Sequence, residues 1–266
     1  MKKQVIVTAI LTITQIIRTI IVVAIIVTQY VINQVMIVVI QTVKKKPLIN
    51  EVPIKVNQTI QTLKPAFYLI LTRKEWLEAR KGGVGASEID SVLGRNPYTK
   101  PEDILKRKLG IKEVFTPDAI ARMRDGQIFE PTIIHLYALK TGLQIESKSL
   151  KDKLYYDPEN PFLLASLDGM VTRKDGTKYL IDAKYSKAKF WQECKTEYYY
   201  GQAQQQMYLL DLYYHEFVVL NPDIEDVTPE SLIIVPTVRD DKFIKDILIP
   251  GAKEFWQTVI NRKKEL

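Results

Sequence analysis

Residues 165–184, ASLDGMVTRKDGTKYLIDAK, place two aspartates and a lysine around one short turn. Asp168 precedes the first strand-like run, while Asp182 and Lys184 lie in the second run, with one residue between them. Asp168, Asp182 and the backbone carbonyl of Ala183 offer hard oxygen ligands, which suit Mg²⁺ or Mn²⁺. A lysine beside such an ion can orient or deprotonate a water and stabilise charge on a phosphate under attack. The stretch therefore predicts metal-dependent chemistry at a phosphate.

This chemistry requires the three side chains to share one face of a β-hairpin. A two-residue loop at the Asp-Gly turn would place Asp168 opposite Ala183, on the face away from Asp182 and Lys184. A three-residue loop, centred one step to either side, would place Asp168 opposite Asp182 or Lys184. The hypothesis therefore requires an odd-numbered loop or a bulge. The alternative is a solvated hairpin with a surface ion pair, but the apolar residues around both aspartates favour an interior position.

Composition restricts the other kinds of site that the chain can build. Cys194 is the only cysteine, which excludes an intrachain disulfide and a cysteine cluster for zinc or iron–sulfur. The two histidines, His135 and His215, do not form a His-x-x-x-His pair. We expect both histidines to be structural or exposed, and any metal to be held by oxygen.

The net charge of +7 over 266 residues does not by itself indicate nucleic-acid binding. Residues 1–50 hold six lysines and arginines and no acid. The rest of the chain therefore has 32 of the 38 basic residues and all 31 acidic residues. The main body is nearly neutral, and a DNA-binding surface in it must be a local cluster. Basic residues that could form such a cluster, or only a solvated face, are Lys106, Arg107, Lys108, Arg122 and Arg124.

The first 46 residues differ from the rest and are interpreted as an apolar low-complexity extension. Residues 4–43 are almost wholly Ile, Val, Thr and Gln, and an uncharged run covers residues 19–43. This run is long enough for a membrane anchor, but its glutamines and β-branched residues equally suit a tail outside the folded domain. Residues 47–66 are interpreted as a linker because of their prolines. Residues 67–266 form the predicted catalytic domain.

Hydrophobic periodicity in that domain predicts an α/β (α+β) fold. Helices are expected at residues 72–80, 87–94, 101–110, 118–142, 198–213 and 241–266. Strands are expected at residues 153–157, 162–173, 178–186, 215–221 and 231–238. Thr72 and Glu75 form a predicted capping box at the start of the first helix.

Five motifs make the chain resemble the YqaJ-like viral recombinases, the lambda-type exonuclease branch of the PD-(D/E)XK nucleases. They are EWLEARKGGVGASEIDSVLGRNPY, GQIFEP, ASLDG, IDAKYS and YYYGQAQQQM, in the order of the family. The resemblance runs from about Trp76 to the C-terminus and does not include residues 1–65. It implies a restriction-endonuclease-like central mixed β-sheet flanked by helices.

The resemblance also implies a role for each matching side chain. The Mg²⁺ ligands would be Glu130, Asp168, Asp182 and the carbonyl of Ala183, with Mn²⁺ able to substitute for Mg²⁺. Lys184 would be the catalytic lysine and Gln204 the catalytic-site glutamine. Residues that would contact DNA and its 5′-phosphate are Arg80, Ser87, Ser166 and Gln202.

Three positions depart from the family pattern. Asp182 stands where relatives usually have Glu, and Leu167 replaces the commoner Pro before the first aspartate. Gly85 stands where the lambda-type enzyme has a hydroxyl residue, so we expect a weaker or differently shaped 5′-phosphate pocket. The departures bear on end-specificity more than on metal-dependent cleavage.

The function implied is a Mg²⁺-dependent deoxyribonuclease, a 5′→3′ exonuclease on double-stranded DNA in phage-type recombination. Its expected partners are double-stranded DNA, a single-strand annealing protein and copies of itself in a ring. Its expected location is the cytoplasm of a bacterium or phage-infected host, or the membrane if residues 4–43 are an anchor. The alternatives are a structure-selective or nicking endonuclease of the same superfamily and a non-catalytic DNA-binding or membrane-tethered module.

Several aromatic and amide side chains have a structural interpretation as well. Trp76 is expected in the core, and packing is favoured over DNA contact for the tyrosines at 198–200. Gln202, Gln204 and Gln206 cannot all face one way on a helix, so at least one is expected at the surface.

Overall fold

The computed structural model describes residues 66–112, 114–192 and 195–266. The predicted apolar extension, residues 1–46, lies outside the described residues, as does the predicted linker up to residue 65. Among the helices of the described ranges, none has both the length and the apolar character needed to span a bilayer.

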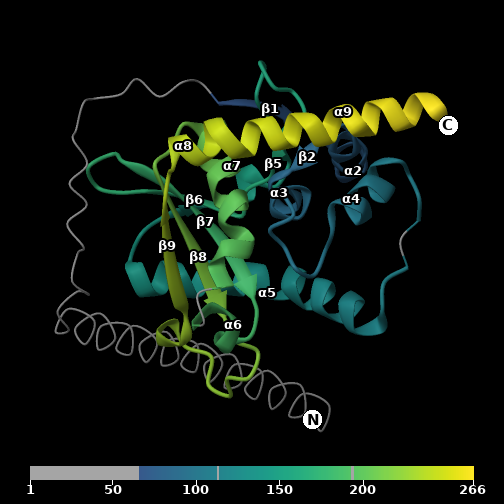
Figure 1. Ribbon diagram of the computed structural model, residues 1–266. Helices are drawn as coiled ribbons and strands as arrows, with labels where there is room; N and C mark the ends of the chain where they lie inside the picture. The colour runs from purple at the N-terminus through teal and green to yellow at the C-terminus, as the bar shows by residue number, and fades with distance from the viewer. Residues whose placement is uncertain (1–65, 113, 193–194) are drawn as a thin grey trace, which may run out of the picture. The chain divides into compact units, whose positions relative to one another are not determined.

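The strands form two mixed β-sheets (Figure 1). The first has the order β1-β4-β5-β2 and contains β1 (Phe67–Ile70), β4 (Lys153–Tyr156), β5 (Leu163–Ala165) and β2 (Val84–Gly85). The second has the order β3-β6-β7-β8-β9 and contains β3 (Ile145–Glu146), β6 (Gly169–Thr172), β7 (Lys178–Tyr185), β8 (Tyr214–Leu220) and β9 (Ile233–Val238). The mixed α/β class is confirmed, but two sheets replace the single expected one.

The division into two sheets follows from a break in one predicted strand. Residues 162–173 were expected to be continuous, yet β5 ends at Ala165 and β6 begins at Gly169. β5 pairs with β4 and β2, whereas β6 pairs with β3 and β7. Residues 166–168 therefore connect the two sheets, and Asp168 lies at this connection.

The helices of the described residues are α2 (Arg73–Ala79), α3 (Ala86–Val92), α4 (Pro101–Lys108), α5 (Pro117–Thr141), α6 (Ala188–Gln192), α7 (Tyr200–Leu210), α8 (Asp241–Phe243) and α9 (Ile249–Glu265). Single 3-10 turns occupy Arg80–Gly82, Lys148–Leu150, Lys195–Tyr199 and Pro229–Ser231, and a π-helical turn, Ile244–Leu248, joins α8 to α9. Five predicted helices are present with small shifts at their ends, α6 was not predicted, and the predicted closing helix at 241–266 is divided into α8, the π-helical turn and α9. The capping box of Thr72 and Glu75 is present at the start of α2.

Two helices cover opposite faces of the second sheet (Figure 1). Ile133 and Tyr137 of α5 share one core cluster with Tyr179 and Ile181 of β7. Leu180, the residue between them, belongs to the other cluster, which contains Met207 of α7. Because side chains alternate along a strand, Asp182 and Lys184 lie on the same face as Leu180, the face covered by α7.

Candidate active site

The β6–β7 hairpin has the odd loop that the chemical hypothesis requires. Gly169 pairs with Ile181, and continuing this antiparallel register brings Asp168 beside Asp182. The loop holds three residues between Arg173 and Thr177, and its last residue, Gly176, has φ +84°. A glycine in the left-handed region closes this type of loop, and it sets the register that places both aspartates on one face.

Asp182 and Lys184 form a buried ion pair on that face. Asp182 is only 3% exposed, and its Oδ2 lies 2.5 Å from Lys184 Nζ. The same ammonium donates to Gln202 Oε1 at 3.2 Å. Asp168 is held next to the pair because its Oδ2 accepts a hydrogen bond of 2.9 Å from the backbone N–H of Ala183. The structure therefore brings Asp168, Asp182 and Lys184 together.

Two glutamines of α7 position Asp182. The amides of Gln202 and Gln206 both donate to Asp182 Oδ1, at 2.7 and 3.3 Å. Gln206 Nε2 also reaches the carbonyl of Ser166 at 3.1 Å, and Gln206 Oε1 lies 3.0 Å from His215 Nε2. Residues four apart share a helix face, so the spacing of Gln202 and Gln206 is consistent with both contacting the same carboxylate.

Gln204, the expected catalytic-site glutamine, lies elsewhere. Its amide donates to the Val238 carbonyl at 2.8 Å, and its oxygen accepts the Asp240 N–H at 2.7 Å. It therefore fastens the end of β9, while Gln202 occupies the position next to the acids. All three glutamines are buried, so the expectation of a surface glutamine is wrong. Backbone carbonyls and carboxylates satisfy their amides inside the protein.

Glu130 is not in contact with the two aspartates. It lies on α5 beside Phe129, which stacks on Tyr185, and its Oε1 pairs with Lys151 Nζ at 3.2 Å. Its negative charge nevertheless contributes to raising the pKa of Asp168. Within the described ranges, no group of three or more His, Cys, Asp or Glu side chains is arranged to hold a metal ion.

Burial and like charge make the two aspartates a strained pair. Burial, followed by the charges of Asp182 and Glu130, raises the pKa of Asp168 well above its ordinary value. Burial alone would lower the pKa of Lys184, but Asp182, Tyr199 and Asp168 together outweigh it and raise that pKa. The site therefore holds a protonated lysine next to a carboxyl whose ionisation is disfavoured by burial and by neighbouring negative charge.

These residues fit a hard divalent cation. Mg²⁺ in proteins commonly uses only one or two carboxylates and keeps several waters, so Asp168 and Asp182 suffice as its principal protein ligands. Among the described residues, the charged partner of Asp182 Oδ2 is the Lys184 ammonium at 2.5 Å. A cation bound between the two aspartates would favour the ionised form of Asp168, whose pKa is raised by burial and by neighbouring carboxylates.

A second group of predicted residues gathers around Trp76. The indole N–H of Trp76 donates to Ser166 Oγ at 3.0 Å, and the Arg80 guanidinium lies 4.6 Å from the centre of the indole. Arg80 Nη2 donates to Ser87 Oγ at 3.1 Å. Trp76 is buried against Leu164, as predicted for a core residue. Arg80, Ser87 and Ser166 thus form one polar cluster, joined to Asp182 through Gln206.

A buried ion pair supports this cluster, and the sequence analysis did not predict it. Glu88 Oε2 accepts hydrogen bonds from the Gly85 N–H at 2.8 Å and from Lys108 Nζ at 2.7 Å. Lys108 also donates to the carbonyl of Arg80 at 3.0 Å. Lys108 is buried, so the expectation of a solvated face is wrong for this residue. A Cβ at Gly85 would lie 3.1 Å from Arg80 Nη2, which leaves little space for a larger residue.

Asp90 of α3 fixes the start of α7. Its carboxylate is buried and accepts the N–H groups of Gly201 at 2.9 Å and Gln202 at 3.0 Å. Burial raises the pKa of Asp90 to about 6. A Cβ at Gly201 would come within 2.8 Å of Asp90 Oδ1, so this close approach requires glycine. Asp90 had no signal in the sequence, because its partners lie more than 100 residues away.

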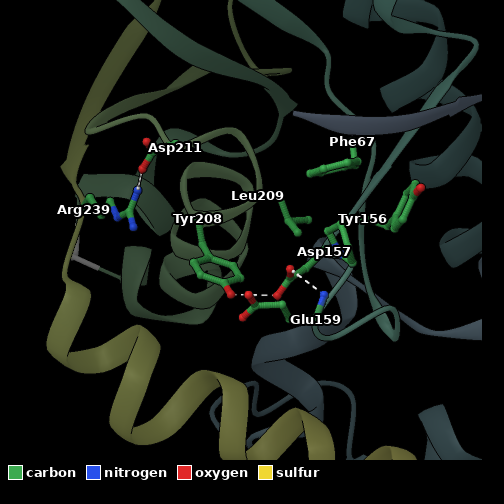
Figure 2. A pocket seen from close by; sticks show the side chains of 9 residues that line it. Phe67, Tyr156, Asp157, Glu159, Tyr208, Leu209, Asp211 and Arg239 are labelled. Atoms are coloured by element: carbon green, nitrogen blue, oxygen red, sulfur yellow. Dashed lines mark hydrogen bonds and ion pairs between the residues drawn. The ribbon is translucent and has the colours of Figure 1, made fainter. Parts of the chain in front are cut away.

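A cavity of about 330 Å³ lies apart from these residues (Figure 2). Its lining includes Asp157, which accepts the Tyr208 hydroxyl at 2.7 Å, and Arg239, which pairs with Asp211 at 2.9 Å. None of the predicted site residues lines it. The candidate site is therefore defined by the convergence of polar side chains.

Comparison with known proteins agrees with the arrangement of these elements. A model of the YqaJ-like viral recombinase domain matches residues 75–211. The uncharacterized protein YqaJ of Bacillus subtilis is 26% identical over 192 residues, which cover 70% of this chain and 56% of that protein. The chain thus spans little more than half the length of this relative.

Two solved structures share the fold. An alkaline exonuclease from Laribacter hongkongensis matches with a TM-score of 0.54 and 23% identity, over 72% of this chain and 95% of that one. A phage-related exonuclease from Haemophilus somnus matches with a TM-score of 0.51 and 16% identity, over 68% of this chain and 96% of that one.

Proposed function

The chain belongs to the YqaJ-like viral recombinase family, and from this premise we propose that it is a deoxyribonuclease that uses a divalent metal, Mg²⁺ or Mn²⁺. We further propose 5′→3′ exonuclease action on double-stranded DNA in phage-type recombination. The observation that carries the proposal is the convergence of Asp168, Asp182 and Lys184 on one face of β7. The solved structures of similar fold, which are named as exonucleases, support it.

The two aspartates would hold the metal, with the carbonyl of Ala183 as a further ligand. When bound, the ion would lower the pKa of a water and screen the charge that develops on the phosphate. Gln202 and Gln206 both donate to Asp182 Oδ1, so they fix the orientation of this carboxylate. Glu130, 3.2 Å from Lys151, would act through its charge or through a water.

Lys184 would act as a cation and not as a base. The carboxylate of Asp182 raises the pKa of its ammonium, so it is protonated at neutral pH. Asp182 and Gln202 already hold the ammonium in place. Its positive charge next to the reacting phosphate therefore needs no rearrangement during the reaction. Such a preorganised donor stabilises the transition state and can also orient the attacking water.

The cluster around Trp76 would bind the 5′-terminal phosphate. Arg80 supplies a guanidinium suited to phosphate oxygens, and Ser87 and Ser166 supply hydroxyl groups. Ser166 stands two residues before Asp168, and its carbonyl shares Gln206 with Asp182. A phosphate held at this cluster would thus have a fixed relation to the acids.

Digestion of end-labelled linear duplex, with and without a 5′-phosphate, tests the function. Lys184→Ala should lose degradation while remaining folded, with a lowered melting temperature because Asp182 loses its buried partner. Lys174→Ala, which changes an exposed lysine of the same hairpin, should behave as wild type. Covalently closed circular DNA should resist both. Unchanged degradation by Lys184→Ala would refute the assigned site, and cleavage of closed circles would refute the exonuclease.

Titration calorimetry tests the metal separately. Mg²⁺ binding should be present in the wild type and lost in Asp182→Ala. Equal binding by the two proteins would remove the proposed site.

The proposal extends to the expected partners. A ring of identical subunits would enclose the duplex, and an annealing protein would receive the single strand left by digestion. Sedimentation equilibrium tests the first of these, because a chain that remains monomeric at all concentrations does not form a ring.

A further inference from the structure

A continuous series of aromatic rings leads from Lys184 to the protein surface. Lys184 Nζ lies 4.8 Å from the centre of the Tyr199 ring, which contacts Phe190 at 5.9 Å between centroids. Phe190 contacts Tyr198 at 6.0 Å, and Tyr198 contacts Tyr98 edge-to-face at 6.1 Å. Tyr98 is 71% exposed. Successive rings are in direct contact, so the series connects Lys184 to an exposed aromatic side chain at the surface.

The inner part of this series is packed and the outer part is open. Tyr199 stacks on Trp191, which in turn contacts Phe217 in the core. The packing predicted for the tyrosines at 198–200 is therefore found for Tyr199 and Tyr200, which both pack against the core. Tyr98 and Tyr198, by contrast, meet at 89°, an arrangement that leaves ring faces uncovered by their mutual contact.

The loop that carries Tyr98 is fixed by the residue that fixes α7. The carbonyl of Asp90 accepts the N–H groups of Arg95 and Asn96, at 2.8 and 3.1 Å. The side chain of Asn96 then accepts the Tyr98 N–H at 2.8 Å. Since the carboxylate of Asp90 holds the start of α7, the exposed ring and the helix bearing Gln202 are held by one residue.

We infer that Tyr98 and Tyr198 bind one unpaired nucleobase within the first few nucleotides of the DNA end. This inference rests on the proposed nuclease function and adds a base-binding element to it. Every base has a flat aromatic face, so stacking on tyrosine holds a strand without selecting its sequence, as an exonuclease requires. The preorganised loop limits the conformational entropy that would be lost on binding.

A cycle of protein and DNA changes tests the contact. Binding of 5′-phosphorylated duplexes is measured by fluorescence anisotropy in EDTA, with an abasic residue at each of the first few positions of either strand in turn. At one position, the abasic change should weaken wild-type binding by about 5- to 150-fold, the effect of one stacked base. Tyr98→Ala should weaken binding of intact DNA by a similar factor and show no further abasic loss at that position.

Two variants serve as controls. Tyr98→Phe keeps the ring and should retain the wild-type pattern, and Tyr68→Ala removes a partly exposed tyrosine of β1 outside the series. Tyr68→Ala should show the full abasic loss at the same position. Thermal melts confirm that each variant is folded.

The outcomes separate this inference from the proposed function. The inference is overturned if the affinity losses from Tyr98→Ala and from the abasic residue multiply at every position. It is also overturned if an abasic residue does not weaken binding by the wild type. Both results hold against the inference even when the wild type degrades DNA. If the losses fail to multiply at one position, the base contact is supported. If that position is found but the wild type shows no degradation with Mg²⁺ or Mn²⁺, the base contact is supported and the proposed nuclease function is overturned.

Discussion

Asp90→Ala offers the sharpest test of how the site is held together. In the wild type, the buried carboxylate accepts two N–H groups from the first turn of α7. Alanine leaves both donors without this acceptor, at roughly 1–3 kcal/mol each, or about 4 kcal/mol together. Gln202 supplies one of these two N–H groups, and its side-chain amide donates to Asp182. The start of α7 and this amide should therefore shift together.

The stability cost of this change should depend on pH in an unusual direction. The pKa of Asp90 is about 6 in the folded protein, against an ordinary value of 3.8. The stability contributed by this group is therefore fully present below about pH 4 and is lost as pH rises through 6. The difference between the two pKa values corresponds to about 3 kcal/mol. Asp90→Ala should thus cost about 4 kcal/mol near pH 4 but only about 1 kcal/mol at pH 7.5.

Thermal melts of the wild type and of Asp90→Ala at pH 4 and pH 7.5 measure this difference. Each kcal/mol lowers the melting temperature by about 2–4 °C in a domain of this size. Other titrating groups are common to both proteins and cancel in the comparison. Asp118→Ala, an exposed acid in the first turn of α5, is the matched control and should cost under about 1 kcal/mol at both pH values. A deficit that grows with pH would refute the reasoning.

Activity at pH 7.5 completes this test, because the variant remains folded there. Displacement of Gln202 should slow degradation of linear duplex by roughly 10- to 100-fold. Wild-type activity in a folded Asp90→Ala protein would show that the start of α7 does not position the site.

Three further perturbations test separate parts of the structure. Gln202→Leu should slow DNA degradation by about 100-fold, whereas Gln204→Leu should lower the melting temperature and keep activity; equal kinetic effects would contradict the assignment. Gly85→Ala puts a Cβ 3.1 Å from Arg80 Nη2 and should reduce the preference for 5′-phosphorylated ends in a competition assay, while degradation without that phosphate stays unchanged. Gly176→Ala forces a side chain into φ +84° and should destabilise the hairpin by roughly 1–2 kcal/mol in denaturant unfolding, and no loss would argue against this loop.

Local signals in the sequence determined most elements and the residue types of the site. The capping box of Thr72 and Glu75 and the turn glycine at 176 act over three or four residues, so they can be read without the fold. The Asp168, Asp182 and Lys184 set was visible because strand periodicity and the family motifs coincide there. The four-residue spacing of Gln202 and Gln206 puts them on one helix face, but the sequence did not show which glutamines face the acids.

Tertiary structure alone decided which of these side chains meet. The loop register placed Asp168 beside Asp182, and the break after Ala165 divided one expected sheet into two. Gln204 turned to β9, while Asp90, without any local signal, became the anchor of α7. Such contacts join residues 14 to more than 100 positions apart, and hydrophobic periodicity carries information only about neighbours within a few turns or strands. Which buried polar group finds which partner is settled when the helices pack on the sheets.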